Sequence, residues 1–186
     1  MEKVIDAISK VSRRDFVPDN LLYRADYDTA LPIGYDQTIS QPSLVKEMTG
    51  LLEVNKDHRI LEIGTGSGYQ AAVLSFLAKD VYTVERIPEL QKQAQERFKK
   101  LNLSNIHVFK KDGKYGLKEY APFDRIIVTA ASPNIPTALR EQLKEGGIII
   151  LPIGRENDVQ ILTKGVKKKN NLDLQQIEYV QFVPLV

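Results

Sequence analysis

The stretch Glu62-Ile63-Gly64-Thr65-Gly66-Ser67-Gly68 has glycine at three alternate positions. It follows the apolar run Arg59-Ile60-Leu61 and precedes a helical pattern over residues 69–78. Glycine lets a backbone turn sharply and lets a ligand approach closely, and the start of a helix offers unpaired N–H groups. A glycine triplet alone also occurs in tight strand-to-helix turns that bind nothing. The stretch therefore predicts a strand, a tight loop and a helix, and its surroundings decide whether the loop binds a ligand.

An acid on the next apolar run supports a nucleotide site. Glu85 ends the run Val81-Tyr82-Thr83-Val84-Glu85, 21 residues after Gly64. In a nucleotide-binding α/β fold, an acid at that place accepts hydrogen bonds from ribose hydroxyls. The dinucleotide fingerprint is G-x-G-x-x-G, whereas the spacing here is G-x-G-x-G. The spacing thus disfavours a nicotinamide-binding oxidoreductase.

Strand and helix patterns alternate on both sides of this unit. The predicted strands are residues 81–85, 106–109, 123–129 and 148–151, with helices over 88–101 and 136–143, the latter ended by Gly146-Gly147. Such alternation implies a parallel sheet with helices on both faces, and continuous apolar strands fit a sheet buried on both sides. Residues 159–166 and 172–184 read as two further strands, joined by a basic turn over 167–171 and at least one of them antiparallel. We therefore predict an α/β fold with a Rossmann-like, doubly wound, mostly parallel sheet of about seven strands.

The first 57 residues have a different character. Val4, Ile5, Ile8 and Val11 recur at helical spacing, and residues 20–38 read as irregular, with Pro32 and Gly34 as breakers. A second helix is expected from Pro42, because proline is favoured at the first helical position. Its inner face would comprise Leu44, Val45, Met48, Leu51 and Leu52. We expect one domain over 1–186, made of N-terminal helices and a substrate-side segment (1–57), a cofactor-binding core (58–154) and C-terminal strands (155–186).

The composition excludes several kinds of chemistry. The chain has 186 residues, no cysteine, and only two histidines, His58 and His107. Disulfides, cysteine-based zinc sites, iron–sulfur clusters and a thiol nucleophile are excluded, and no metal site is expected. We assign neither histidine to catalysis.

Charge and hydropathy bear on partners and location. Lys plus Arg is 26 and Asp plus Glu is 24, so the formal net charge is +2. That is no strong basic field, and the eight tyrosines form no stacking ladder, so no nucleic-acid partner is expected. The N-terminus lacks the apolar core of a signal peptide, and the chain has no apolar run of the about 20 residues that a spanning helix needs. We expect a cytoplasmic protein without a membrane partner, and a monomer, because no long apolar helix face is left over.

The glycine loop has a more specific likeness. With Glu62 two residues before the first glycine, it resembles motif I of the S-adenosylmethionine-dependent methyltransferases. Asp112-Gly113, at the end of the third predicted strand, falls where that family contacts the adenine.

Further stretches narrow the resemblance. They are Leu31-Pro32-Ile33-Gly34-Tyr35-Asp36-Gln37-Thr38-Ile39-Ser40-Gln41-Pro42, Ile126-Ile127-Val128-Thr129-Ala130-Ala131-Ser132-Pro133, Leu143-Lys144-Glu145-Gly146-Gly147-Ile148, Leu151-Pro152-Ile153-Gly154 and Phe182-Val183-Pro184-Leu185. From about Val11 to Val186 the chain is similar to the protein-L-isoaspartate O-methyltransferases. The Thr-Ile-Ser-Gln-Pro and Val-Thr-Ala-Ala segments are far more specific than the glycine loop.

The resemblance implies an activity. The enzyme would methylate the free α-carboxylate of isoaspartyl residues in damaged proteins with S-adenosylmethionine, leaving S-adenosylhomocysteine. The ester would then close to a succinimide that hydrolyses partly to normal aspartate. Damaged proteins and peptides would be its partners. The resemblance assigns Ser40 as the active-site serine, Glu62, Gly64, Thr65, Gly66 and Gly68 to the cofactor loop, Glu85 to the ribose, Asp112 and Gly113 to the adenine, and Thr38, Thr129, Ala130 and Ala131 to the substrate pocket.

This chemistry suits a chain poor in histidine. A carboxylate is already ionised at neutral pH, because carboxyl pKa values lie near 4, so no general base is needed. The enzyme must align the reacting atoms and exclude water. Ser40 lies just before the helix expected at Pro42, and a helix N-terminus attracts a carboxylate. We expect Ser40 and neighbouring N–H groups to hold the substrate carboxylate; the alternative is that Ser40 or Gln41 merely caps the helix.

The sequence departs from the family pattern in places. Asp36 and Lys111 stand where glycine is often found, and family members commonly carry one more helix before the segment matching Val4–Pro18. This keeps open a related methyltransferase that acts on another peptide or a small carboxylate. A binding module without activity is disfavoured by the intact glycines, Glu85 and Ser40.

Overall fold

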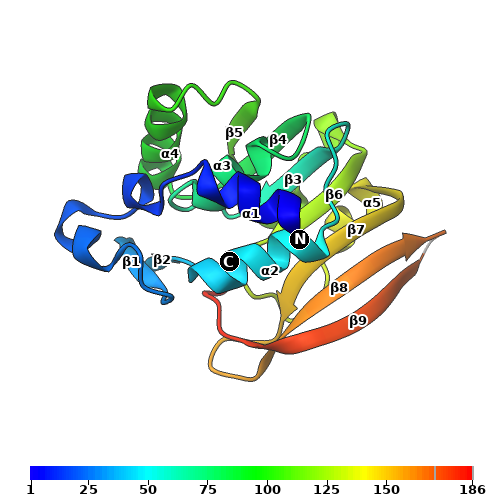
Figure 1. The fold of residues 1–186 in the computed structure, drawn as a ribbon. Helices are drawn as coiled ribbons and strands as arrows, with labels where there is room; N and C mark the ends of the chain where they lie inside the picture. Colours follow the sequence, from blue (N-terminus) through cyan, green and yellow to red (C-terminus); the bar gives the residue numbers. More distant parts are fainter. Residues whose placement is uncertain (170, 186) are drawn as a thin grey trace.

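A seven-stranded sheet forms the centre of the molecule (Figure 1). The computed structural model describes residues 1–169 and 171–185. The strand order is β5-β4-β3-β6-β7-β8-β9, in which β3 to β7 are parallel and β8 is antiparallel to both its neighbours. The strands are β3 (Arg59–Ile63), β4 (Asp80–Glu85), β5 (Ile106–Lys110), β6 (Phe123–Val128), β7 (Leu143–Ile153), β8 (Gln160–Lys168) and β9 (Asn171–Val180). The predicted α/β fold with a mostly parallel sheet is confirmed.

The strand order creates a crevice at the centre of the sheet. The chain runs outward from β3 to β4 and β5, and then returns to place β6 on the other side of β3. Ligands bind such sheets at the carboxyl ends of the strands where the order reverses. The loops after β3 and β6 therefore face the expected ligand site.

Helices cover both faces of the sheet (Figure 1). Side chains alternate along a strand, so Ile60 belongs to one apolar cluster and Leu61 to the other. The first cluster packs against α1 (Glu2–Ser9), α2 (Pro42–Leu51), α3 (Tyr69–Ser75) and α4 (Pro88–Lys100). The second contains Leu139 of α5 (Thr137–Gln142) and Leu117, which lies between the short 3-10 helices η3 (Gly113–Tyr115) and η4 (Lys118–Tyr120). Val45, Met48 and Leu52 of the predicted inner face of α2 are buried.

The segment expected to be irregular, residues 20–38, is more ordered than predicted. It contains most of η2 (Asp19–Arg24) and a hairpin of β1 (Leu31–Gly34) and β2 (Gln37–Ile39). Pro32 lies inside β1 and is no breaker, since an edge strand tolerates a missing donor. The turn consists of Tyr35 and Asp36, with φ of 55° and 56°. Two residues at positive φ match the twist of a hairpin, and aspartate tolerates this conformation, which accounts for Asp36 where glycine is frequent.

The glycine pair Gly146-Gly147 does not end a helix. α5 ends at Gln142 and β7 already begins at Leu143. In the pairing of β6 with β7, Phe123 lies opposite Leu143 but Arg125 lies opposite Ile148, so residues 144–147 form a bulge. Gly146 has a φ of +72° there. The glycines thus permit the bulge that changes the direction of β7. The hydrophobic periodicity of the sequence cannot distinguish such a bulge from the end of a helix.

Several other boundaries differ from the prediction. α3 ends at Ser75 rather than at residue 78, and β9 ends at Val180 rather than at residue 184. α1 ends at Ser9, although Val11 is buried as expected. The basic turn is shorter than predicted, because Lys167 and Lys168 belong to β8 and Asn171 to β9. Lys167 Nζ donates to the carbonyl of Arg140 at 2.8 Å, so it stabilises the C-terminal end of α5. Asn170 of that turn, and Val186, lie outside the described residues.

Within residues 1–169 and 171–185, no helix has the length and apolar character needed to cross a bilayer.

Candidate functional site

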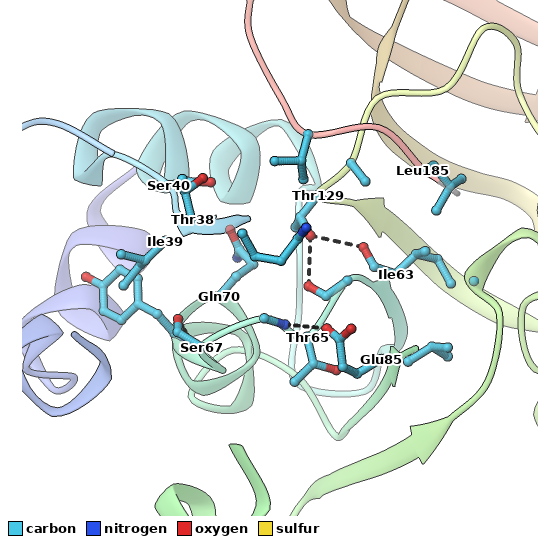
Figure 2. A pocket seen from close by; sticks show the side chains of 18 of the residues that line it. Thr38, Ile39, Ser40, Ile63, Thr65, Ser67, Gln70, Glu85, Thr129 and Leu185 are labelled. Carbon is cyan, nitrogen blue, oxygen red and sulfur yellow. Dashed lines mark hydrogen bonds between the residues drawn. The ribbon is translucent and has the colours of Figure 1, made fainter. Parts of the chain in front are cut away.

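A cavity of about 100 Å³ lies at the carboxyl ends of β3, β4 and β6 (Figure 2). It is bounded by the glycine loop, by the end of β4, by the segment after β6 and by the segment between β2 and α2. These segments are far apart in the sequence. The predicted site residues that line the cavity are Thr38, Ser40, Gly64, Thr65, Gly66, Glu85, Gly113, Thr129 and Ala130.

The loop after β3 has a shape that requires glycine. Gly64, Gly66 and Gly68 have φ of +95°, +52° and +93°, a region that side chains with a Cβ rarely adopt. A Cβ at Gly64 would collide with Thr129 Oγ1, and one at Gly68 would lie 2.7 Å from the Phe98 ring. Thr129 Oγ1 donates to the carbonyl oxygens of Ile63 at 3.1 Å and Gly64 at 2.8 Å (Figure 2). The loop is therefore fixed against β6 and leaves its cavity side free of side chains.

Glu85 joins the loop to the end of β4. One carboxylate oxygen accepts the N–H of Gly66 at 2.8 Å, and the other accepts the N–H groups of Arg86 and Ile87 at 2.9 Å each. The side chain is nearly buried. Since a carboxylate offers about four lone-pair sites, these three bonds leave room for a ligand hydroxyl. The geometry suits the ribose role predicted for Glu85.

Glu62 lies beneath the loop and outside the cavity lining. It is fully buried, and burial raises the pKa of its carboxyl group to about 8, which the hydrogen bond from Thr83 partly opposes. Thr83 Oγ1 donates to Glu62 Oε2 and lies 2.6 Å from Thr65 Oγ1. The other carboxyl oxygen of Glu62, Oε1, has no partner among the described residues. Glu62 therefore acts on the loop through Thr83 and Thr65, as a neutral acid near pH 7.

Replacing Glu62 should flatten the pH dependence of stability. In the folded protein Glu62 keeps its proton up to about pH 8, whereas the unfolded chain loses it above about pH 4.5. The unfolded state thus binds fewer protons, and the free energy of unfolding should fall on the order of a few kcal/mol between about pH 5 and pH 8. Glu62→Gln should remove this slope, as measured by urea unfolding. Glu96→Gln, an exposed change on α4, should keep it; equal slopes for the wild type and Glu62→Gln would contradict the assignment.

Ser40 lies between this cavity and a second, larger cleft. The cleft, of about 540 Å³, runs between residues 29–44 and the end of β9 with the residues that follow it. Both hollows are lined by Thr38, Ser40, Thr129 and Val183. Figure 2 shows Thr38 and Ser40 on the opposite side of the cavity from Glu85. A ligand in the cleft and a ligand at the glycine loop would therefore meet next to Ser40 and Thr129.

The N-terminus of α2 is partly used within the protein. The N–H of Ser43 donates to Asp28 Oδ1 at 2.8 Å, and hydrogen bonds from Ser43 hold the pKa of Asp28 below its usual value. The N–H of Ser43 is thus already bonded within the protein, and the expectation that Ser40 and neighbouring N–H groups hold a carboxylate stays a prediction. The capping alternative is met in part: Gln41 is the N-cap residue by position, but its side chain accepts no helix N–H, and the acceptor at this helix end is Asp28. Neither finding involves the Ser40 hydroxyl.

Four predicted site residues lie away from the cavity lining: Glu62, Gly68, Asp112 and Ala131. Gly68 is the N-cap residue of α3 and lies against the Phe98 ring. Asp112 accepts the N–H of Lys114 at 2.9 Å and caps η3. Ala131 is buried and bonded through its backbone to Val183 and Leu185. The ligand roles of these residues remain predictions.

The segment Phe182–Leu185 is a wall of the site for which no role was predicted. Val183, Pro184 and Leu185 line the cavity. The N–H of Ala131 donates to Val183 at 2.8 Å, and that of Leu185 donates to Ala131 at 2.7 Å. Gln160 fixes Phe182 in both directions, accepting its N–H at 2.6 Å and donating to its carbonyl at 3.1 Å. In the sequence, this segment was one of the stretches that resemble the family and the expected end of the last strand, but β9 already ends at Val180. The other lining residues without a predicted role include Gln37, Ile39, Val45, Met48, Tyr69, Gln70 and Ile87.

The histidines do not line the cavity. His107 contacts Asp80 at 3.1 Å, and His58 contacts Asn55. Across the described part of the chain, no three His, Cys, Asp or Glu side chains are grouped as a metal site would need.

The sheet order, the G-x-G-x-G loop after β3 and the acid at the end of β4 together define a class I S-adenosylmethionine-dependent methyltransferase. The family model described as "Protein-L-isoaspartate(D-aspartate) O-methyltransferase (PCMT)" matches residues 1–186. The chain belongs to this family, as its sequence motifs predict.

Individual proteins similar to this chain have the same family description. A protein-L-isoaspartate O-methyltransferase of Dictyoglomus turgidum is 53% identical over 184 residues, which cover 99% of this chain and 83% of the relative. One of Yersinia pestis is 49% identical over 185 residues, covering 100% of this chain and 88% of the relative. The match thus includes both the cofactor loop and the Ser40 segment.

Solved structures share the whole fold. One protein-L-isoaspartate O-methyltransferase superposes with a TM-score of 0.89 at 29% identity, covering 99% of this chain and 61% of the solved one. A Plasmodium falciparum protein described as a "beta-aspartate methyltransferase (PCMT)" and solved with S-adenosyl-L-homocysteine gives a TM-score of 0.86 at 24% identity; the match covers 100% of this chain and 91% of that one.

Proposed function

We propose that the chain transfers a methyl group from S-adenosylmethionine to the free carboxylate of L-isoaspartyl residues in damaged proteins, which starts their repair through a succinimide. The observation that supports this most directly is the position of Ser40, in the wall common to the cavity at the glycine loop and the larger cleft. The cavity at the glycine loop suits a nucleoside and the larger cleft suits a polypeptide. Reacting groups of the two ligands would meet at the wall that contains Ser40.

The cavity suits S-adenosylmethionine. Gly64 and Gly66 present backbone without side chains, and Glu85 keeps acceptor capacity for ribose hydroxyls. Thr65 and Gly113 line the same cavity, and we propose Asp112 beside them as the adenine-side acid. When bound, the cofactor supplies a methyl group on a positively charged sulfur. Transfer of this methyl to a carboxylate oxygen leaves the sulfur neutral and the cofactor as S-adenosylhomocysteine.

The residues around Ser40 would orient the substrate carboxylate. A hydroxyl can donate one hydrogen bond to it, and Thr38, Thr129, Ala130 and Ala131 would shape the surrounding pocket. Since the carboxylate arrives ionised, no side chain has to remove a proton. The work of the protein is alignment, and geometry of this kind supplies a large share of the rate in bimolecular steps.

A labelling assay tests this function. Purified protein and radiolabelled S-adenosylmethionine would be given an isoaspartyl peptide and the same peptide with normal aspartate. Label in the isoaspartyl peptide alone is the expected result. Label in both peptides, or only in other carboxylates, would favour a related carboxyl methyltransferase. No label, with S-adenosylhomocysteine still bound in calorimetry, would overturn the proposal.

Ser40→Ala tests the orienting hydroxyl. A hydrogen bond to a charged group contributes about 1.5–3 kcal/mol, so kcat/KM for the isoaspartyl peptide should fall about 20-fold. The dissociation constant of S-adenosylhomocysteine should stay within about twofold, because the loop and Glu85 are intact. Ser104→Ala, an exposed change before β5, is the control. Full activity of Ser40→Ala on the isoaspartyl peptide would remove Ser40 from the mechanism.

The remaining expectations about partners and location stay predictions. They are a monomeric state, the absence of nucleic-acid and membrane partners, and the cytoplasm as the site of action. The division of the chain into segments 1–57, 58–154 and 155–186 within one domain is likewise a prediction.

A further inference from the structure

Arg13 is a buried arginine whose two terminal nitrogens bond to backbone carbonyls, while its Nε has no partner among the described residues. It lies in the 3-10 helix η1 (Arg13–Phe16) and is 6% exposed. One terminal nitrogen donates to the carbonyl oxygens of Ala25 at 2.8 Å and Tyr27 at 3.3 Å. The other donates to those of Thr29 at 2.8 Å and Ser40 at 3.1 Å. One guanidinium thus connects three parts of the chain: η1, the loop before β1, and Ser40 in the connection between β2 and α2.

The acids near Arg13 are bonded elsewhere. Burial lowers the pKa of Arg13, while Tyr69, Asp28 and Asp26 oppose that shift. Asp26 accepts from Arg14 at 2.8 Å, and Asp28 accepts from the N–H of Ser43. In the described part of the chain, no carboxylate lies within ion-pair distance of Arg13. A buried charge is costly unless it is hydrogen-bonded, so the four carbonyls hold the guanidinium and the guanidinium in turn fixes them.

Two of the four carbonyls, those of Thr29 and Ser40, belong to residues that line the cleft. Thr29, Ala30, Ser40 and Gln41 line it, and Thr29 and Ser40 are bonded to the same nitrogen of Arg13. The loop of residues 25–29 also carries Asp28, which is bonded to the start of α2. Loss of the guanidinium would therefore release the position of Ser40 relative to Thr29 without removing any group that would touch the substrate.

We infer that Arg13 is a positioning residue for methyl transfer, holding Ser40 and the adjoining cleft wall in register with the cofactor cavity. This inference rests on the function proposed above. The planar fork of arginine can serve several acceptors at once, whereas the lysine ammonium is a compact charge on a flexible stem. Position matters at this distance, because a misplacement of about 1 Å can lower a rate about 100-fold.

Three variants and one control test the inference. Arg13→Met keeps the stem and removes the fork, and should lower kcat/KM for the isoaspartyl peptide about 30-fold; Arg13→Lys should lower it about 8-fold. The loss should include kcat, and the dissociation constant of S-adenosylhomocysteine should change less than about twofold. Arg14→Met is the matched control, since Arg14 is exposed and pairs with Asp26, which is more exposed still; it should behave as wild type. In Arg13→Ala, millimolar ethylguanidinium should restore part of kcat/KM, and it should have no effect on Arg14→Met.

The outcomes separate a positioning role from a role in folding. Calorimetry with S-adenosylhomocysteine counts the folded sites, so kcat is expressed per binding site. Wild-type kcat/KM in Arg13→Met would overturn the inference. So would a loss that disappears after correction for binding sites, or a cofactor affinity that falls as much as kcat/KM. If the wild type labels no isoaspartyl peptide, the proposed function fails instead.

Discussion

Gly64→Ala should weaken S-adenosylhomocysteine binding by roughly 1,000-fold, the largest effect we expect from a single methyl group. Its φ of +95° is strained for alanine, and the new Cβ would collide with Thr129 Oγ1. Left-handed backbone costs about 1–2 kcal/mol and forced packing about 1–3 kcal/mol. The loop must move to relieve both, and the cavity is built on that loop. Isothermal calorimetry gives the dissociation constant.

Two further variants separate strain from collision. Gly146 also has a positive φ, of +72°, but nothing lies within 4 Å of an added Cβ, so Gly146→Ala should leave cofactor binding unchanged. Adding Thr129→Ala to Gly64→Ala removes the colliding oxygen and should recover part of the affinity. Unchanged binding in Gly64→Ala itself would show that the loop tolerates a side chain and that the proposed cavity is wrong.

Glu85→Gln should lower the affinity for S-adenosylhomocysteine about 100-fold, although it changes one atom. Both carboxylate oxygens accept backbone N–H groups. An amide must turn its NH₂ group toward either Gly66 or the pair Arg86 and Ile87, so a donor faces a donor. An unsatisfied buried group costs about 1–3 kcal/mol, and the acceptor for the ribose is weakened as well.

The control for this effect lies one turn further on. Glu89→Gln makes the same chemical change at an exposed position in the first turn of α4, and should leave the dissociation constant within about twofold. A direct fluorescence or calorimetric titration with S-adenosylhomocysteine compares the two. Equal affinities for Glu85→Gln and the wild type would assign the ribose contact to another residue.

The sequence predicted best what local pattern controls. Apolar runs such as Ile60-Leu61 and Ile148–Leu151 become buried strands, and Pro42 starts α2. The hairpin of β1 and β2 was missed, because its strands are short, Pro32 lies inside one, and the turn uses Tyr35 and Asp36 where glycine and asparagine are the usual signals. The bulge of residues 144–147 was missed because it depends on the register of β7 against β6.

For the site, too, the sequence predicted what local pattern controls and missed what depends on distant contacts. Motif spacing located Gly64, Gly66 and Glu85, and the resemblance to the family located Ser40. All four residues line one cavity. Contacts over long sequence separations carry no such pattern. Arg13 reaches Ser40 across 27 residues, and Gln160 reaches Phe182 across 22. Only the folded chain shows that these side chains belong to the surroundings of the site.

The position of the segment Phe182–Leu185 has a consequence for how the two products leave the site. Residues after a last strand usually fray first, but this segment is tied to Gln160 and Ala131, so the N–H groups of Phe182 and Leu185 should exchange with solvent as slowly as those of the neighbouring sheet. Val183 is a wall of both hollows. One local opening of this segment would uncover the nucleoside and the peptide together, so the release of the two products would be coupled through a single motion.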